Sequence, residues 1–203
     1  MRRAISIRNT CVYSDDATCR FSLTRSWDVG QAKLLFVMHN PAQATEVMND
    51  ETVMTCQNLT YAIGIHAFRE EHHLDNGVIL PDAFGSVRIC NLFPAIARDP
   101  GNMAMPPAAT LEANDRVIKA ACRWADRVIC AWGNLPSTRL PQAIRIDALV
   151  RDNVEARHLL CFGVTTARQP FHPRGVKSLG GQLRGLPLEA KMLRRLTLWL
   201  PAP

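Results

Sequence analysis

Four short, mainly apolar runs divide the chain, and each stops at a polar or turn-forming residue. Their length and composition are typical of strands buried on both faces of a sheet. The runs cover residues 34–38, 87–90, 128–131 and 159–162. They are followed in turn by His39-Asn40-Pro41, Asn91, Trp132-Gly133 and Gly163, with Phe171-His172-Pro173 close behind the last. Open α/β sheets bind ligands outside the carboxyl ends of their strands. The pattern therefore predicts one site, built from four strand ends.

The segments between these runs have helical character. Helices are expected at about 53–68, 110–124, 137–149 and 188–200, with a short helical turn at 42–48. Capping residues precede the first of them at Asn49-Asp50-Glu51-Thr52, and Thr110 is the expected N-cap of the second. This alternation predicts an α/β fold, a three-layer α/β/α arrangement with a central, mostly parallel four-stranded sheet.

The length of 203 residues fits a single α/β domain over residues 1–203. Residues 19–27 alternate as a short strand does, and we interpret them as an N-terminal strand extension. Residues 164–203 form a basic C-terminal loop and helix.

Composition excludes several classes of protein. Hydrophobic residues make up 47% and charged residues 21%, which is typical of a globular chain. No apolar run is long enough to span a bilayer, and the N-terminus lacks a signal-peptide core. The seven cysteines are dispersed and contain no C-x-x-C pair, so reduced core thiols are expected. These observations predict a cytoplasmic protein without a membrane, metal or cofactor role.

The net charge of +6 is concentrated at one end of the chain. Residues 1–163 are balanced, whereas residues 164–203 carry seven Lys or Arg against only Glu189. Such a segment is typical of a surface that follows phosphate backbones, or of a solvated surface made soluble by charge. Within it, Arg174, Lys177, Arg194 and Arg195 are the candidate nucleic-acid-binding residues.

Three polar residues at strand ends are candidates for chemistry. Pro41 restricts Asn40, whose amide can position water or bind a ligand but is no strong base. The Asn91 carboxamide offers a donor and an acceptor side by side, which suits the edge of a nucleobase. His172 can donate a hydrogen bond to developing negative charge, or act as an acid. The alternatives are a turn-capping role for each Asn and a surface role for the His.

Other residues near these ends are candidate contacts, while familiar motifs are missing. His39, Pro41 and Trp132 adjoin the predicted pocket, and Phe93 can offer a stacking surface or simply be core. The histidines and glutamates of 66–73 include only one Glu-x-x-His spacing, so a solvated helix end is favoured over a metal site. The chain has no phosphate-binding loop, dinucleotide fingerprint or nucleophile elbow.

In order along the chain, several motifs resemble the domain-of-unknown-function 1643 family of bacteria and phages. They are Arg20 to Trp27, Phe36 to Ala42, Asn49 to Thr52, Cys90 to Phe93, Asp99-Pro100, Ala131 to Gly133 and Phe171 to Pro173. The family usually has Asn-Pro-Ser-Thr-Ala where this chain has Asn40-Pro41-Ala42-Gln43-Ala44, and Asp-Pro-Thr where it has Asp50-Glu51-Thr52. Both departures fall near the predicted pocket.

The same positions resemble, more distantly, the uracil-DNA glycosylase superfamily. Asn40-Pro41 is similar to its first motif, Asn91 to its base-reading Asn, and His172-Pro173 to its late His-Pro-Ser loop, with Arg174 in place of Ser. The resemblance implies that Asn40 positions the attacking water, Asn91 reads the base edge, His172 stabilises the leaving base and Phe93 stacks on it. It also implies a base extruded into the pocket.

The leading hypothesis is therefore a metal-independent enzyme that hydrolyses an N-glycosidic bond in a nucleic acid or nucleotide. Two alternatives remain open. One is a non-catalytic nucleic-acid-binding module, and the other is an enzyme that acts on a small nucleotide-like metabolite. The sequence indicates no obligatory protein partner.

Overall fold

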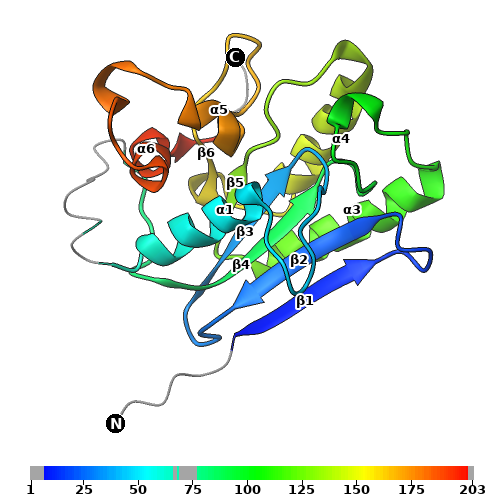
Figure 1. The fold of residues 1–203 in the computed structure, drawn as a ribbon, viewed down its shortest axis with the longest axis horizontal. Coiled ribbons are helices and arrows are strands. Elements are labelled where there is room, and N and C mark those ends of the chain that lie inside the picture. Colours follow the sequence, from blue (N-terminus) through cyan, green and yellow to red (C-terminus); the bar gives the residue numbers. More distant parts are fainter. Residues whose placement is uncertain (1–6, 66–67, 69–76, 201–203) are drawn as a thin grey trace.

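A seven-stranded mixed sheet organises the part of the chain that the computed structural model describes, residues 7–65, 68 and 77–200 (Figure 1). The strand order is β1-β2-β4-β3-β5-β6-β7. Their bounds are Arg8–Tyr13 (β1), Arg20–Ser26 (β2), Ala32–Met38 (β3), Phe84–Asn91 (β4), Arg127–Cys130 (β5), Leu159–Cys161 (β6) and Thr197–Leu198 (β7).

The four strands expected from the apolar runs are the parallel centre of this sheet. β4, β3, β5 and β6 pair in parallel, with Leu34 opposite Val87 on one side of β3 and Arg127 on the other. Three antiparallel strands extend the sheet, and the sequence predicts one of them, β2, as the strand at 19–27. β1 and β2 add to the β4 edge and β7 adds to the β6 edge.

Helices cover both faces of the sheet. They are α1 (Glu51–Ala62), α3 (Ala108–Trp124), α4 (Leu140–Arg151), α5 (Pro173–Lys177) and α6 (Leu188–Arg195). Contacts join α1 to α5 and α6, and α3 to α4. Short 3₁₀ helices occur at Pro100–Asn102, Ser137–Arg139, Ala156–His158 and Gly181–Leu183.

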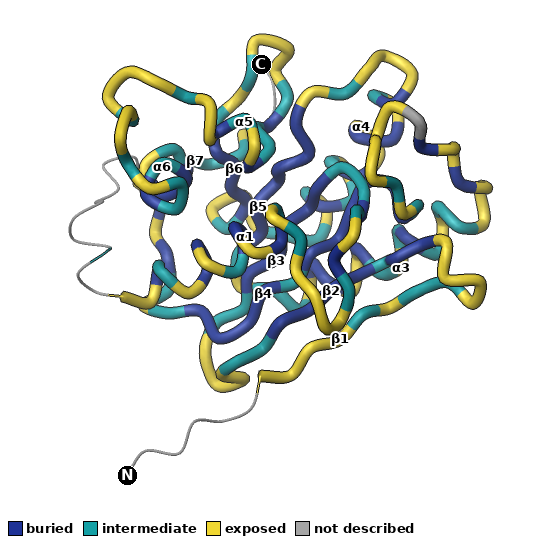
Figure 2. The backbone as a smooth tube through the Cα atoms, viewed as in Figure 1, coloured by how far each residue is buried: buried dark blue, intermediate teal, exposed yellow. Residues whose placement is uncertain are grey.

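Successive residues of β3 contribute to two different hydrophobic cores. Leu34, Phe36 and Met38 belong to the core that includes residues of α1 and α6, and Leu35 and Val37 to the core that includes residues of α3 and α4. Alternate side chains of a strand point to opposite faces, so a strand covered on both sides is apolar throughout. The buried centre of the sheet and the exposed β1 edge are evident in Figure 2.

Helix boundaries differ from expectation where local contacts override the sequence pattern. α1 begins at Glu51, after its N-cap Asp50, and ends at Ala62, well before Phe68. The N-cap of α3 is Pro107 rather than Thr110. The last helix stops at Arg195, because the chain then turns to pair as β7 with β6.

The helical turn expected at 42–48 is wrong, since these residues form an irregular loop. The buried Arg25 side chain donates to the carbonyl oxygens of Thr45, Glu46 and Met48. Carbonyl groups bound by a side chain do not need helical partners. β2, expected as an extension, therefore fixes the loop that precedes α1.

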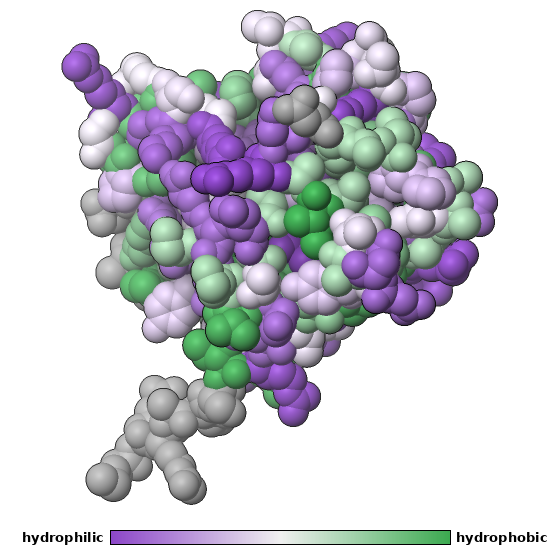
Figure 3. Space-filling view, turned by 45° about the vertical axis from the view of Figure 1, so that its right-hand side comes forward, coloured by the Kyte–Doolittle hydropathy of each residue, from purple (hydrophilic) through white to green (hydrophobic). Residues whose placement is uncertain are grey.

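No helix in the described ranges combines the length and apolarity that crossing a bilayer requires. On the face drawn in Figure 3, hydrophobic residues occur in small groups between hydrophilic ones. Scattered exposed apolar residues of this kind are normal on a protein surface.

Candidate active site

A pocket of about 240 Å³ lies at the carboxyl ends of the parallel strands. Pockets for drug-sized ligands hold roughly 300–1,000 Å³, so this one suits a smaller molecule or part of one. The loops after all four parallel strands contribute to its lining, with His39, Asn40, Asn91, Trp132, His172 and Arg174 among the residues. The structure thus brings most of the residues singled out by sequence into one place.

Asn40 is half-buried and its amide is held in one orientation. Its Nδ2 donates to the carbonyl oxygens of Pro41, at 2.9 Å, and Ala97, at 2.8 Å. An amide nitrogen has two hydrogens, so both are used. Oδ1 is then the atom that can accept a hydrogen bond from a ligand or a water molecule. Pro41 itself is buried, does not line the pocket, and accepts a backbone hydrogen bond from Ala97.

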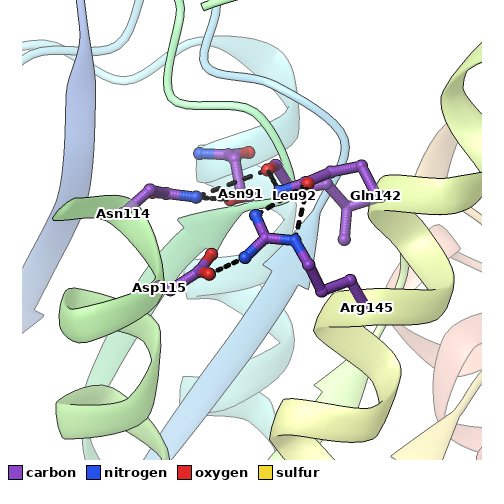
Figure 4. Close-up of polar contacts among 6 residues, drawn as sticks. All are labelled: Asn91, Leu92, Asn114, Asp115, Gln142 and Arg145. Carbon is purple, nitrogen blue, oxygen red and sulfur yellow. Dashed lines mark hydrogen bonds and ion pairs between the residues drawn. The ribbon is translucent and has the colours of Figure 1, made fainter. Parts of the chain in front are cut away.

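Asn91 ends β4 and is 1% exposed. Its Nδ2 has no hydrogen-bond partner, although its main-chain oxygen accepts from Nδ2 of Asn114 at 2.9 Å. Gln142 donates to the next carbonyl, that of Leu92, at 2.8 Å (Figure 4). Arg145 contacts both Gln142 and Asp115, and so links α4 to α3 behind the strand end. The backbone around Asn91 is therefore fixed, while its amide nitrogen remains unpaired inside the protein.

His172 is the N-cap of α5, and its Nδ1 accepts from the main-chain N–H of Arg174 at 3.2 Å. In a neutral imidazole the proton is then on Nε2, which becomes a donor. Burial, followed by the charges of Arg174 and His39, lowers the pKa of His172 to about 4. The side chain is therefore a neutral Nε2–H donor at ordinary pH.

Gly133 brings the loop after β5 against His172. Its φ is +76°, and a Cβ built there would lie 3.0 Å from the Cβ of His172. Its N–H also donates to the carbonyl oxygen of Pro170, two residues before His172. Glycine adopts positive φ without strain, so it permits this close approach.

His39 is the second neutral histidine of the pocket. Burial and the charge of Arg139 lower its pKa to about 4. Arg139 Nη1 lies 3.4 Å from Nε2 of His39, and only a neutral ring nitrogen can accept there. Phe93 packs edge-on against His39 with a ring-centroid distance of 5.7 Å. Phe93 is fully buried and does not line the pocket, so it supports His39 rather than facing a ligand.

Trp132 lines the pocket with a side chain that is 3% exposed. Its indole N–H donates to Gln169 Oε1 at 2.9 Å, and Trp199 packs edge-on against it. The loops after β5 and β6 are joined by this contact, which stiffens the side of the pocket that holds His172.

Sequence reasoning did not identify three charged residues of the pocket, Arg20, Asp50 and Arg98. Asp50 was expected only as a cap, a role it has, since Oδ1 accepts from Val53 N at 2.8 Å. Its Oδ2 also accepts from Ala44 N, at 3.3 Å. Arg20 is 2% exposed. The sequence offered one signal for Arg20, namely a cation within a partly apolar strand. A charge in such a strand is buried only if a structural or functional role compensates the cost.

The four candidate nucleic-acid-binding residues lie in different settings. Arg174 is exposed and lines the pocket. Lys177 forms an ion pair with Glu51 at 2.9 Å, and Arg195 donates to Phe162 O at 3.2 Å. Arg194 is exposed on α6. Only Arg174 among them joins the pocket.

Metal binding has no support in the described part of the chain. Residues 7–65, 68 and 77–200 contain no group of three His, Cys, Asp or Glu arranged to hold an ion. The histidines and glutamates of 66–73 lie outside the described residues.

Comparison with known proteins agrees with the resemblance expected from the motifs. The family described as "Protein of unknown function (DUF1643)" matches residues 20–69 and 78–174, a span that includes the pocket residues from Arg20 to Arg174. No curated protein and no solved structure matches the chain. Since the matched residues make up most of the sequence, the chain belongs to the domain-of-unknown-function 1643 family.

Proposed function

We propose that this protein hydrolyses an N-glycosidic bond and releases a nucleobase from a nucleotide or nucleic acid. The observation that carries the proposal is the shared pocket of Asn40, Asn91 and His172. Each presents a different hydrogen-bonding group there, namely a free acceptor, a buried unpaired donor and a neutral imidazole N–H.

The proposed reaction uses these groups in one hydrolytic step. Asn40 Oδ1 orients a water molecule for attack on C1′ of the sugar. The C1′–N bond breaks, and its electron pair leaves on the base nitrogen. Water supplies the hydroxyl group at C1′, and its remaining proton ends on the base or in solvent. An amide is no strong base, so the attack depends on a sugar carbon that is already electron-poor.

His172 would stabilise the leaving base. A neutral Nε2–H can donate to negative charge that develops on a base oxygen, and it needs no prior protonation. Asn91 would bind the edge of the base from the floor of the pocket. The pocket volume supports a base-sized occupant, with the rest of the substrate outside.

The proposal includes a uracil-DNA-glycosylase-like fold, and the architecture of the sheet supports it. Parallel strands with helices on both faces, and a site at their carboxyl ends, are features on which that resemblance depends. The proposal includes one domain over residues 1–203 and a cytoplasmic location, which the seven free cysteines support. Arg174, at the pocket and on the basic segment, would meet a phosphate of the substrate.

The decisive experiment measures free base released from oligonucleotides and nucleosides that carry deaminated or modified bases. Asn40→Ala is the informative variant, because it removes the Oδ1 acceptor that would orient the water molecule. Loss of that acceptor should lower release by roughly 100-fold or more, the scale of a misplaced catalytic group. Asn153→Ala is a matched control, since Asn153 donates only to Leu149 O at the end of α4.

The same assay separates the alternatives. Release from nucleosides but not oligonucleotides favours a small nucleotide-like substrate. Salt-sensitive oligonucleotide binding without release from any substrate favours a non-catalytic module. No release and no binding across the panel contradicts the proposal.

A further inference from the structure

Arg20 is a buried cation without a counterion in the described part of the chain. It is 2% exposed, its Nη1 donates to Ala44 O, and its Nε has no hydrogen-bond partner. Asp50 is the carboxylate that lines the same pocket, but its oxygens accept from the backbone N–H groups of Val53 and Ala44. A buried charge is costly unless it is paired and hydrogen-bonded. The unpaired donor of Arg20 therefore needs an explanation.

An irregularity in β2 directs Arg20 to the pocket. Val12 pairs with Ser22 but Tyr13 pairs with Arg20, so Phe21 is an extra residue in β2. Tyr13 and Cys11 lie on one face of β1, and Cys11 pairs with Leu23 of the α1-side core. An extra residue changes the face on which the next side chain lies. Arg20 consequently lies on the same face as Leu23 and lines the pocket.

Asn91 provides a second buried donor in the same pocket. Its Nδ2 is unpaired, and its residue is 1% exposed. Asn91 ends β4, the strand that pairs directly with β2. In Figure 4, no dashed line reaches its amide nitrogen, although its main-chain oxygen is bound.

We propose that Arg20 and Asn91 form a subsite for an oxyanion, a carboxylate or phosphate group of the substrate. Arg20 Nε and Asn91 Nδ2 are both donors, so the group that satisfies them must present acceptors only. The charge of Arg20 selects an anion over a neutral carbonyl, because only an anion supplies the missing counterion. The subsite deepens the proposed function: Asn91 Nδ2 would bind the oxyanion, and its Oδ1 would be left for the edge of the base. It rests on the proposed function in placing the substrate in this pocket.

The charge balance of the pocket agrees with an anionic ligand. Arg20, Arg98 and Arg174 line it, against the single carboxylate of Asp50. His39 and His172 are neutral at ordinary pH and do not add to either side. Arg98 and Arg174 are exposed at the rim, whereas Arg20 is the buried cation of the floor.

Arg25, on the same strand, is a matched internal control. It is 3% exposed, but its Nε, Nη1 and Nη2 all donate to acceptors of the 45–49 loop. It does not line the pocket. The two buried arginines of β2 therefore differ in that Arg20 lines the pocket and has an unpaired Nε, whereas Arg25 does neither.

The test observes the arginine Nε–H groups directly by ¹H–¹⁵N NMR during titrations of the whole protein. Sodium phosphate and sodium acetate are the anionic probes, and acetamide is the neutral probe. The Arg20 signal should shift saturably with at least one anion and not with acetamide, while the Arg25 signal stays in place. The stronger of the two anions identifies the group as phosphate or carboxylate. No saturable shift with either anion, or an equal response to acetamide, overturns the subsite.

Asn91→Asp tests the second donor without a change of shape. It replaces Nδ2 by a carboxylate oxygen, so anion binding should weaken by roughly 10- to 100-fold, the value of a hydrogen bond to a charged group. An unchanged Arg25 signal shows that the variant is folded. Unchanged affinity in a folded variant removes Asn91 from the subsite.

Base release is measured on the same preparations, so the two proposals fail separately. Anion binding without base release contradicts the hydrolase and leaves the subsite. Base release without anion binding contradicts the subsite and leaves the hydrolase.

Discussion

The strand-end pocket and the basic C-terminal segment differ in how their polar groups are partnered. In the pocket, Asn91 Nδ2 and Arg20 Nε are buried and unpaired. In residues 164–203, Lys177 pairs with Glu51, and Lys191 Nζ donates to Lys177 O and Leu179 O. The guanidinium of Arg195 lies 5.3 Å from the centre of the Phe171 ring. The C-terminal segment, which carries the net positive charge, thus uses part of that charge in its own structure. The unsatisfied donors lie in residues 1–163, where acidic and basic residues are equal in number.

Unpaired buried donors are therefore a more specific indication of a candidate site than a count of charged residues. A surface cation is solvated whether or not a ligand arrives, so its presence decides little. A buried donor without a partner costs free energy until a ligand supplies an acceptor. Two residues, His172 and Arg174, belong to both regions.

The largest effect on stability is expected behind the pocket, at Asn114. Asn114 is fully buried and donates to the carbonyl oxygens of Asn91 and Leu92. Asn114→Leu removes these bonds from the end of β4 and should lower the free energy of unfolding by about 2 kcal/mol. Urea denaturation measures this change. Asn153→Ala, at a helix end away from the pocket, should cost less than about 1 kcal/mol.

An equal loss of unfolding free energy in Asn114→Leu and Asn153→Ala would show that the hydrogen bonds of Asn114 do not stabilise the end of β4 more than an ordinary helix end. It would contradict the contrast between the two regions.

Gly133→Ala should affect activity more than stability. The new Cβ would meet the Cβ of His172 at 3.0 Å, and the φ of +76° disfavours a side chain. A cost of about 1 kcal/mol is expected from the backbone, and displacement of His172 should lower base release by about tenfold or more. Gly181→Ala is the control, because Gly181 also has positive φ but no atom within 4 Å of a built Cβ. Similar activity losses in both variants would contradict the positioning of His172 by Gly133.

Acidification should destabilise the pocket region through its two histidines. Folding lowers the pKa of His39 and His172 from about 6.5 to about 4, so the unfolded state binds more protons between these values. The free energy of unfolding is therefore highest above about pH 6.5 and falls as the pH drops towards 4. Allowing for partial exposure, the two residues together should account for roughly 1–2 kcal/mol.

Denaturation of the protein and of His172→Gln over this pH range measures the effect. The variant should show a smaller loss on acidification, and an identical loss would exclude His172 as a contributor.

The sequence predicts the parallel centre of the sheet well because its strands are continuous apolar runs with helices between them. Strands that add to an edge are harder to recognise. β1 is mostly exposed and β7 has only two residues, so neither has a buried pattern that the sequence could reveal. The pairing that forms them is decided by the tertiary structure.

The candidate site was predicted from polar residues at or after the carboxyl ends of predicted strands. Three residues chosen in this way, Asn40, Asn91 and His172, line one pocket. The sequence did not reveal that Arg20 lines the pocket, because this depends on an extra residue in β2 that changes the face on which its side chain lies. Phe93 precedes a loop that carries pocket residues, but its ring is buried against His39 and Arg139. Neighbouring positions in sequence thus do not determine which side chain faces a cavity.

The smallest effect is expected at Lys177, in the basic segment. Lys177 and Glu51 form an exposed ion pair, so Lys177→Gln should change the free energy of unfolding by less than about 0.5 kcal/mol. If Lys177 also contacts a phosphate of an oligonucleotide, the slope of log affinity against log salt should fall by about 0.9 for duplex DNA. Arg174→Gln, changed at the pocket rim, should lower both that slope and the affinity for a base-bearing substrate. An unchanged slope in Lys177→Gln would remove Lys177 from the nucleic-acid surface.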